Sequence, residues 1–169
     1  MMCASLMHDA SMMRVGLGQD LHRLVKGRPF LLGGVEIPAE KGEFAHSDGD
    51  VLAHAVIDAI LGAAGLGDIG EFFPPTDPAW KDADSMELLR CAFSKVTEAG
   101  WSLVNLDCVL ICEQPKILPF RKAIRDSLAA ALKVSAERIF VKGKTYEGIG
   151  PLGNGEAVEA LAVCLLEKA

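Results

Sequence analysis

Apolar residues recur at three- and four-residue spacing just after residue 50, which is the period of a helix with one apolar face. Ser47 or Asp48 is placed to cap this helix by accepting a hydrogen bond from a free backbone N–H, and Asp50 falls in the first turn. The apolar positions are Val51, Leu52, Ala55, Val56, Ala59 and Ile60. The helix is expected to end near the glycines Gly62, Gly65 and Gly67.

Two further helices follow from the same periodicity. One is expected to begin at Asp84 or Ser85, with Glu87 placed for a capping-box contact, and to reach Gly100; the other covers about residues 118–132. Short alternating or apolar runs predict the strands: 14–22, a hairpin of 30–32 and 35–37 about two glycines, 101–113, 139–144, and a long central strand 157–166. Residues 41–42 and 68–77 are expected to be loops, the second rich in Gly and Pro.

Strands that alternate with about three helices indicate an α/β or α+β fold, a two-layer domain in which a mainly β sheet is covered on one face by helices. The 169 residues fit one domain, which we expect to span 13–169. Residues 1–12 lack the pattern of a signal peptide and are expected to form a disordered N-terminal extension.

Composition narrows the choice of partners. Hydrophobic residues make up 50% of the chain and the mean hydropathy is +0.27, yet no run approaches the ~20 apolar residues of a membrane helix. The apolar excess is therefore expected to cover contacts between subunits. The net charge of −6 argues against a nucleic-acid binder. An acidic protein that handles phosphates needs local positive charge, which bound metal supplies efficiently.

The cysteines are scattered and form no Cys-x-x-Cys pair. Their odd number suits reduced thiols that fill the core of a protein in the cytoplasm, and gives no support to a cysteine zinc site. They are Cys3, Cys91, Cys108, Cys112 and Cys164.

Three side chains could meet as metal ligands. On the predicted strand, Asp20 and His22 project to one side and Leu21 to the other. His54 joins them from the helix, giving three N/O ligands and one open position, as in a catalytic zinc site. Asp58, one turn beyond His54, is a candidate partner for its imidazole, although a solvated helix face explains these polar residues equally well.

One motif is misleading. The sequence Gly148-Ile149-Gly150-Pro151-Leu152-Gly153 matches G-x-G-x-x-G, but only 16 residues follow it, too few for the rest of a dinucleotide-binding unit. A flexible loop that contacts phosphate is the better interpretation.

Several motifs together resemble the 2-C-methyl-D-erythritol 2,4-cyclodiphosphate synthases, from about Met13 to the end of the chain. They are Asp20-x-His22, Ala45 to Asp50 with His54, Gly67 to Asp77, Asp82 to Ser85, Gln114 to Pro119 and Lys142 to Glu156. The resemblance implies a homotrimer with active sites between subunits, and a lyase reaction of the non-mevalonate isoprenoid pathway. In that reaction the 2-phosphate of 4-diphosphocytidyl-2-C-methyl-D-erythritol 2-phosphate attacks the β-phosphorus, closes a cyclic diphosphate and expels CMP.

The resemblance also implies roles for single residues. Zn²⁺ would be held by Asp20, His22 and His54, with a β-phosphate oxygen as fourth ligand, and Mg²⁺ or Mn²⁺ by Glu147. His46 and Thr145 would stabilise the transition state by hydrogen bonds. The substrate contacts implied before residue 80 are Asp20, Leu21, His22, His46, Ser47, Asp68, Ile69, Gly70, Phe73, Pro74, Pro75, Thr76 and Asp77. Those implied after residue 110 are Cys112, Glu113, Gln114, Pro115, Lys116, Ile117 and Leu118 for the cytidine, and Lys144, Thr145, Tyr146, Glu147, Pro151 and Asn154.

Two positions depart from the bacterial pattern. Where that pattern has Thr-Thr before the metal glutamate, this chain has Lys144-Thr145-Tyr146-Glu147, and Asn154 stands where the pattern has an arginine that faces phosphate. We expect Lys144 to supply the missing positive charge, although lysine lacks the bidentate fork of arginine.

Two other functions use the same ligands. In a zinc-dependent phosphohydrolase the open position would hold a water molecule, and the products would be linear. A non-catalytic oligomer that binds metal or nucleotide would turn nothing over, and gives no reason for the Glu147 loop.

Overall fold

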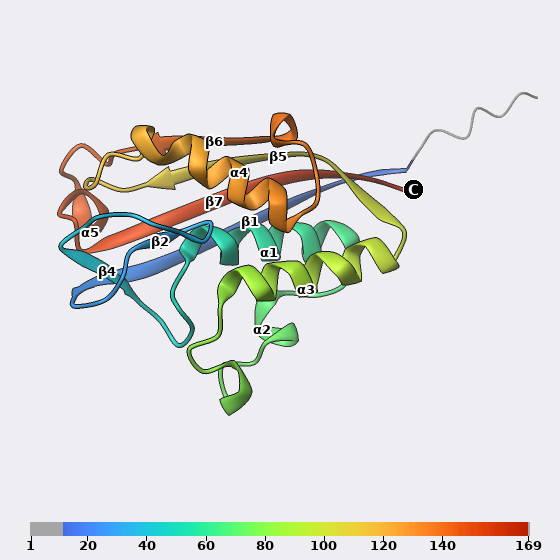
Figure 1. Ribbon diagram of the computed structural model, residues 1–169, viewed down its shortest axis with the longest axis horizontal. Helices are drawn as coiled ribbons and strands as arrows, with labels where there is room; N and C mark the ends of the chain where they lie inside the picture. Colours follow the sequence, from blue (N-terminus) through green and yellow to red (C-terminus); the bar gives the residue numbers. More distant parts are fainter. Residues whose placement is uncertain (1–11, 169) are drawn as a thin grey trace, which may run out of the picture.

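The computed structural model describes residues 12–168, in which a five-stranded sheet has the order β4-β1-β7-β5-β6 (Figure 1). The strands are β1 (Met13–Lys26), β4 (Lys41–Phe44), β5 (Trp101–Ile111), β6 (Ile139–Lys144) and β7 (Ala157–Lys168). β5 and β6 pair in parallel and the other neighbours are antiparallel. The predicted hairpin forms a separate ribbon of β2 (Leu31–Leu32) and β3 (Val35–Glu36). The long central strand predicted at residues 157–166 corresponds to β7, which is the middle strand of the sheet.

The three long helices share one layer. α1 (Val51–Ala64) lies on β1 and β7, α3 (Ser85–Glu98) packs beside α1, and α4 (Arg121–Ala131) lies along β6 (Figure 1). Two short helices, α2 (Ile69–Phe72) and α5 (Gly150–Gly153), lie outside this layer. The prediction of a mixed α/β fold with a mainly β sheet is confirmed, and five α-helices in the described residues replace the predicted three.

Two glycines let α1 come very close to β1. A Cβ atom added at Gly16 would lie 1.9 Å from the carbonyl oxygen of Ala59, and one added at Gly18 would lie 1.9 Å from that of Ala55. No side chain other than hydrogen fits in that space. Gly18 is two residues before Asp20 and Ala55 follows His54, so this contact also sets the distance between the strand and helix that carry the candidate ligands.

The N-terminus of α1 differs from the prediction. Its cap is Asp50 rather than Ser47 or Asp48: the Asp50 carboxylate accepts from the N–H of Ala53 at 3.0 Å. The same carboxylate accepts from the N–H groups of Gly33 and Gly34 at 2.9 and 2.6 Å. The β2–β3 turn therefore covers this end of the helix, and Asp50 is buried instead of sharing a solvated face with His54.

Other differences have local causes. The predicted loop at residues 41–42 is the start of β4, because it pairs with the end of β1, which runs four residues beyond the predicted strand. The predicted loop 68–77 contains α2, capped by Asp68, whose carboxylate accepts from the Glu71 N–H at 2.9 Å. Glu87 makes no capping box; it pairs with Arg90. The third predicted helix begins as a 3₁₀ turn before α4.

Of the cysteines that the structure describes, all four are free thiols, and Cys108, Cys112 and Cys164 are buried as predicted for core residues; Cys91 is exposed. Cys3 and residues 1–11 of the predicted extension lie outside the described residues. Within residues 12–168, no helix combines the length and apolar character needed to cross a bilayer.

The sheet face away from the helices carries exposed apolar side chains. Val15, Leu17 and Leu21 alternate along β1 with the glycines and ligands that face α1, and they are 69%, 65% and 56% exposed. Val163 on β7 pairs with Leu17 in register and is also exposed. A single chain thus leaves an apolar strip open to water.

Substituting Gly18 with alanine tests the close contact of α1 with β1. We expect Gly18→Ala to lower the free energy of unfolding by ~1–3 kcal/mol, because the methyl group meets helix backbone that cannot rotate away. Gly62→Ala is the matched control: it lies in α1 with open space around it, and should raise stability by up to ~1 kcal/mol. Urea unfolding measures both. A Gly18→Ala protein as stable as the parent would contradict the packing account.

Candidate metal centre

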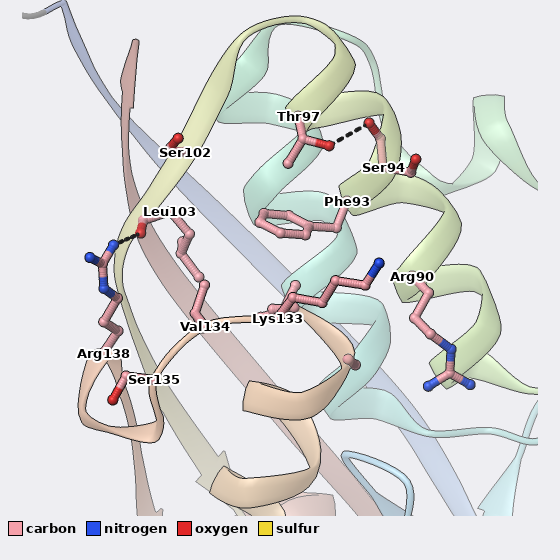
Figure 2. Close-up of a pocket in the computed structure, with 12 residues that line it drawn as sticks. Arg90, Phe93, Ser94, Thr97, Ser102, Leu103, Lys133, Val134, Ser135 and Arg138 are labelled. Carbon is pink, nitrogen blue, oxygen red and sulfur yellow. Dashed lines mark hydrogen bonds between the residues drawn. The ribbon is translucent and has the colours of Figure 1, made fainter. Parts of the chain in front are cut away.

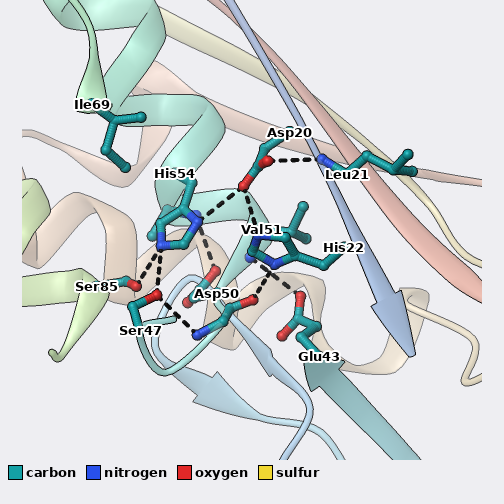
Figure 3. A network of polar contacts seen from close by, with 12 residues as sticks. Asp20, Leu21, His22, Glu43, Ser47, Asp50, Val51, His54, Ile69 and Ser85 are labelled. Atoms are coloured by element: carbon teal, nitrogen blue, oxygen red, sulfur yellow. Dashed lines mark hydrogen bonds and ion pairs between the residues drawn. The ribbon is translucent and has the colours of Figure 1, made fainter. Parts of the chain in front are cut away.

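The three predicted ligands converge on one point (Figure 3). Asp20 and His22 come from β1 and His54 from the first turn of α1, and one donor atom from each lies within 4.8 Å of the others. Oδ2 of Asp20 is 3.1 Å from Nε2 of His22 and 2.9 Å from Nδ1 of His54. Two imidazole nitrogens and a carboxylate oxygen form a donor set that suits zinc and leaves room for a further ligand.

The outer nitrogen of His22 fixes its tautomer. Nδ1 of His22 is 2.8 Å from the carbonyl oxygen of Gly49, which can only accept a hydrogen bond. Nδ1 must therefore carry the proton, which leaves Nε2 free to bind a cation in the neutral imidazole. A backbone carbonyl is a common partner for a metal-bound histidine.

His54 presents its other nitrogen to the centre. Its Nδ1 faces Asp20, and its Nε2 lies 3.1 Å from the Ser47 hydroxyl and 2.8 Å from the Ser85 hydroxyl. Asp58, the predicted partner, does not orient this imidazole: its carboxylate accepts from the Ile69 N–H at 2.8 Å. The sequence reading missed the part played by Ser85, although it marked that residue as a helix start and as part of a motif.

The charges at the centre favour a cation. Burial alone would raise the pKa of Asp20, but hydrogen bonds from His22 and His54 outweigh burial and hold that pKa far below its usual range. For His22, burial lowers the pKa, and the hydrogen bond with Asp20 overcomes it and raises the value. The metal-free centre is thus built around an ionised carboxylate between two imidazoles.

A hollow of about 310 Å³ opens beside the centre. Phe73 and Trp80 form one wall, with ring centroids 5.1 Å apart in an edge-to-face contact. Trp80 and Leu88 were not predicted to belong to the site. The predicted residues that line this hollow are Asp20, His22, His46, Ser47, His54, Asp58, Ile69, Gly70, Phe73 and Pro75.

A second hollow, of about 570 Å³, is lined by many of the substrate contacts predicted after residue 110. There the Thr145 hydroxyl donates to the carboxylate of Glu147, and Glu147 has a left-handed backbone, with φ of 51°. Arg121 also lines this hollow and was not predicted. The predicted residues in its lining are Cys112, Lys116, Ile117, Leu118, Lys144, Thr145 and Glu147.

The remaining predicted residues lie elsewhere. A third hollow contains Glu113, Gln114, Pro115 and Asn154, and a fourth contains Leu21 and Pro151. Leu21 points away from the metal centre, as the strand alternation predicted. The residues outside these hollows are Asp68 and Asp77, which cap short helical turns, and Pro74, Thr76 and Tyr146. Within one chain, the predicted site is therefore divided among separate hollows.

One more hollow, of about 560 Å³, lies between α3 and the segment that follows α4 (Figure 2). Arg90, Lys133 and Arg138 stand at its edges, and Phe93 lies in its wall. Its lining residues include no histidine, cysteine or carboxylate, so it offers no ligand set comparable with that of Asp20, His22 and His54.

A buried acid lies beneath the centre. The carboxyl group of Glu43 accepts from the N–H groups of Leu31 and Val51 at 3.1 and 3.2 Å. Burial, together with repulsion from Asp50, raises the pKa of Glu43 to about 9. Burial raises the pKa of Asp50 as well. A proton on Glu43 at neutral pH therefore keeps two negative charges from lying side by side in these buried surroundings.

Comparison with known proteins adds a family assignment to this geometry. The model of the YgbB family matches residues 13–167. The 2-C-methyl-D-erythritol 2,4-cyclodiphosphate synthase of Treponema denticola is 62% identical over 154 residues, which cover 91% of this chain and 96% of the relative. The synthase of Rubrobacter xylanophilus is 55% identical over 159 residues, covering 92% and 96%.

Solved structures agree with these relatives. The bifunctional IspDF protein of Campylobacter jejuni superposes with a TM-score of 0.91 at 44% identity; the match covers 95% of this chain but 43% of that longer one. A 2C-methyl-D-erythritol-2,4-cyclodiphosphate synthase in its CDP-bound form gives a TM-score of 0.84 at 45% identity, covering 90% of this chain and 99% of that one.

Replacing the buried acid tests its protonation. Because the folded pKa of Glu43 is about 9 and the ordinary value is 4.5, between these pH values the folded protein keeps a proton that the unfolded chain has already lost. Its contribution should lower the free energy of unfolding as the pH rises through that window, by up to ~1.4 kcal/mol per pH unit. Glu43→Gln cannot ionise, so chemical unfolding of the metal-free variant should depend less on pH. Glu40→Gln, at an exposed position, should match the parent. Equal pH slopes for parent and Glu43→Gln would show that Glu43 is ionised in the folded protein.

Proposed function

The chain belongs to the YgbB family, and on this basis we propose that it converts 4-diphosphocytidyl-2-C-methyl-D-erythritol 2-phosphate to 2-C-methyl-D-erythritol 2,4-cyclodiphosphate and CMP. The resemblance found in the sequence motifs is confirmed by relatives with that enzyme name at 62% and 55% identity. The observation that supports the proposal best is the convergence of Asp20, His22 and His54, whose donor atoms lie within 4.8 Å. The enzyme is then a lyase of isoprenoid precursor synthesis.

We assign Zn²⁺ to the Asp20, His22 and His54 group and Mg²⁺ or Mn²⁺ to Glu147. The two imidazoles and one carboxylate suit zinc, and a single carboxylate that shares a hard cation with phosphates suits magnesium. When bound, the two cations would offset the negative charge of the substrate diphosphate. The protein then has to hold the ligands, position the substrate and keep its phosphates in line.

The proposed reaction needs no proton transfer from the nucleophile to the protein. An oxygen of the 2-phosphate attacks the β-phosphorus, and the bond from that phosphorus to the bridging oxygen breaks, so that CMP leaves with the electron pair. The attacking phosphate has a second pKa of about 6 and is already anionic at neutral pH. No general base is needed, which leaves both histidines of the centre free to act as ligands. Holding attacker and target together in one folded substrate could lower the barrier by ~7–11 kcal/mol.

Two residues are assigned to the transition state. His46 lines the hollow beside the metal group, and Thr145 lines the second hollow next to Glu147. Each can donate a hydrogen bond to a phosphoryl oxygen as charge builds up there. Ser47 and residues 68–70 are assigned to the erythritol phosphate, because Ser47, Ile69 and Gly70 line the same hollow as the metal group.

The cytidine is assigned to residues 112–118. Cys112, Lys116, Ile117 and Leu118 line the second hollow, and a structure of a related synthase contains CDP. Lys144 lies in the same lining, where its ammonium group could meet a phosphate. This placement supports the expectation that Lys144 replaces the charge absent at Asn154.

We further propose that three copies assemble, with each active site between two of them. The exposed strip of Val15, Leu17 and Leu21 needs a cover, and a second copy of the same sheet would provide one. One substrate must reach both the metal group and the cytidine residues, which line separate hollows in a single chain. Hollows contributed by neighbouring copies would meet that need. We place the enzyme in the cytoplasm, as the free thiols suggest.

The alternative functions have less support. A zinc phosphohydrolase could use the same three ligands, but the relatives carry the name of a cyclodiphosphate synthase. A non-catalytic oligomer gives no reason for the Glu147 loop, in which Thr145 donates to the Glu147 carboxylate at the lining of the second hollow.

The activity can be tested directly. Incubating the protein with the proposed substrate, Zn²⁺ and Mg²⁺ should give CMP and a cyclic diphosphate. ³¹P NMR detects both products. His54→Ala should lose the activity nearly completely, because it removes a metal ligand. A linear diphosphate as product would favour the hydrolase, and binding of CDP without any turnover would favour the non-catalytic oligomer.

Light scattering tests the assembly. The parent should have about three times the 18.0 kDa mass of one chain. Leu17→Asp places a charge in the exposed strip and should give monomers that have lost activity, whereas Leu17→Ile should remain trimeric and active. A fully active monomer would contradict the proposed shared sites.

A further inference from the structure

We infer that Ser85 and Asp48 form a hydrogen-bond relay that orients His54 for metal binding, which makes both of them positioning residues. The inference rests on the proposed metal-binding role of the Asp20, His22 and His54 group. It assigns a function to the start of α3, a helix that supplies no ligand of its own.

The direction of the hydrogen bonds follows from the donors and acceptors that are present. The Ser85 hydroxyl donates to Oδ1 of Asp48, because an ionised carboxylate can only accept. The Ser85 oxygen then accepts from Nε2–H of His54, 2.8 Å away. In the metal-free centre Nδ1 of His54 shares a proton with Asp20, 2.9 Å away. When a cation takes the place of that proton, an imidazole protonated at Nε2 presents the lone pair of Nδ1 to it. The relay therefore holds the proton on Nε2, which is the arrangement that His54 needs to bind a cation through Nδ1.

Asp48 is itself held in place. Its Oδ2 accepts from the backbone N–H of Ser85 at 3.0 Å, and its Oδ1 also accepts from the Asp50 N–H at 3.2 Å. The backbone N–H of Asp48 donates to the Ala83 carbonyl at 3.1 Å. These contacts join the loop before α1 to the start of α3, so that the carboxylate cannot rotate away from Ser85.

Ser85 is free for this task because its neighbour caps the helix. The Asp84 carboxylate accepts from the N–H of Met86 at 2.7 Å and serves as the N-cap of α3. A serine at a helix start would often use its own hydroxyl in that way. Here the hydroxyl belongs to a fully buried side chain that faces His54 (Figure 3) and donates to the Asp48 carboxylate.

The other nearby serine has a different part. The Ser47 oxygen lies 3.1 Å from Nε2 of His54 and accepts from the Gly49 N–H at 3.2 Å. No carboxylate fixes the direction of its hydroxyl proton among the contacts of the described residues. Because Ser47 also lines the hollow, its proton can turn toward a substrate phosphate, while the Ser85 proton is committed to Asp48.

Zinc affinity, measured by competition with a chromophoric chelator, tests the relay without substrate. Ser85→Ala should weaken zinc binding about 10- to 100-fold, the usual cost of losing an outer partner of a metal-bound histidine. Ser94→Ala is the matched control: the same change in the same helix at an exposed position, with no expected effect on zinc affinity. Ser85→Thr retains a hydroxyl and should recover part of the loss.

A double-mutant cycle distinguishes a relay from simple anchoring of the loop. Asp48→Asn should weaken zinc binding less than Ser85→Ala does, since Ser85 keeps its hydroxyl. If Asp48 acts through Ser85, the double variant should bind zinc within about twofold of Ser85→Ala. Losses that multiply in the double variant would overturn the relay, as would a Ser85→Ala protein with the affinity of the parent.

A measurement on the unaltered protein covers the case in which a variant fails to fold. In the zinc-loaded protein labelled with ¹⁵N-histidine, Nε2–H of His54 should give a proton signal that exchanges slowly with water, because it is buried against Ser85. Fast exchange would overturn the inference. If the parent binds no zinc at all, the proposed metal centre fails together with the relay; if the parent binds zinc and Ser85→Ala binds it equally well, only the relay fails.

Discussion

The contact between α1 and β1 is the constraint on which the metal group depends. Gly16 and Gly18 let the helix backbone approach the strand so closely that a Cβ atom would lie 1.9 Å from a carbonyl oxygen. At that separation the imidazole of His54 reaches Asp20 at 2.9 Å. Larger residues at the two positions would push the helix outward and open a gap between the ligands. The two glycines thus allow close packing of α1 on β1, and the same backbone contact sets the distance between His54 and Asp20.

Around this contact, each polar group of the centre has a partner that fixes its direction. His22 is held by the Gly49 carbonyl and His54 by two serine hydroxyls. Asp50 accepts from one backbone N–H of α1 and from two of the β2–β3 turn. Among the described residues, no buried side-chain nitrogen or oxygen lacks a hydrogen-bond partner. Such a network limits the movement of the ligand side chains, so these side chains lose little conformational freedom when a cation binds.

Sequence patterns predicted the parts of the structure that depend on local order. The strand 139–144 was predicted to the residue, and the ligand trio followed from an i, i+2 pair on a strand and one helix residue. Contacts between distant segments were not accessible in this way. The cap Asp50, the edge strand at Lys41 and the role of Ser85 all depend on partners far away in the chain. The division of the predicted substrate contacts among separate hollows is likewise a property of the fold.

The central claim is that Asp20, His22 and His54 hold one cation between β1 and α1. Anomalous diffraction at the zinc absorption edge, from crystals grown with Zn²⁺, tests it most directly. We predict one strong peak per chain, ~2.0–2.2 Å from Nε2 of His22, Nδ1 of His54 and a carboxylate oxygen of Asp20. A zinc-containing crystal with no peak among these three side chains would contradict the account.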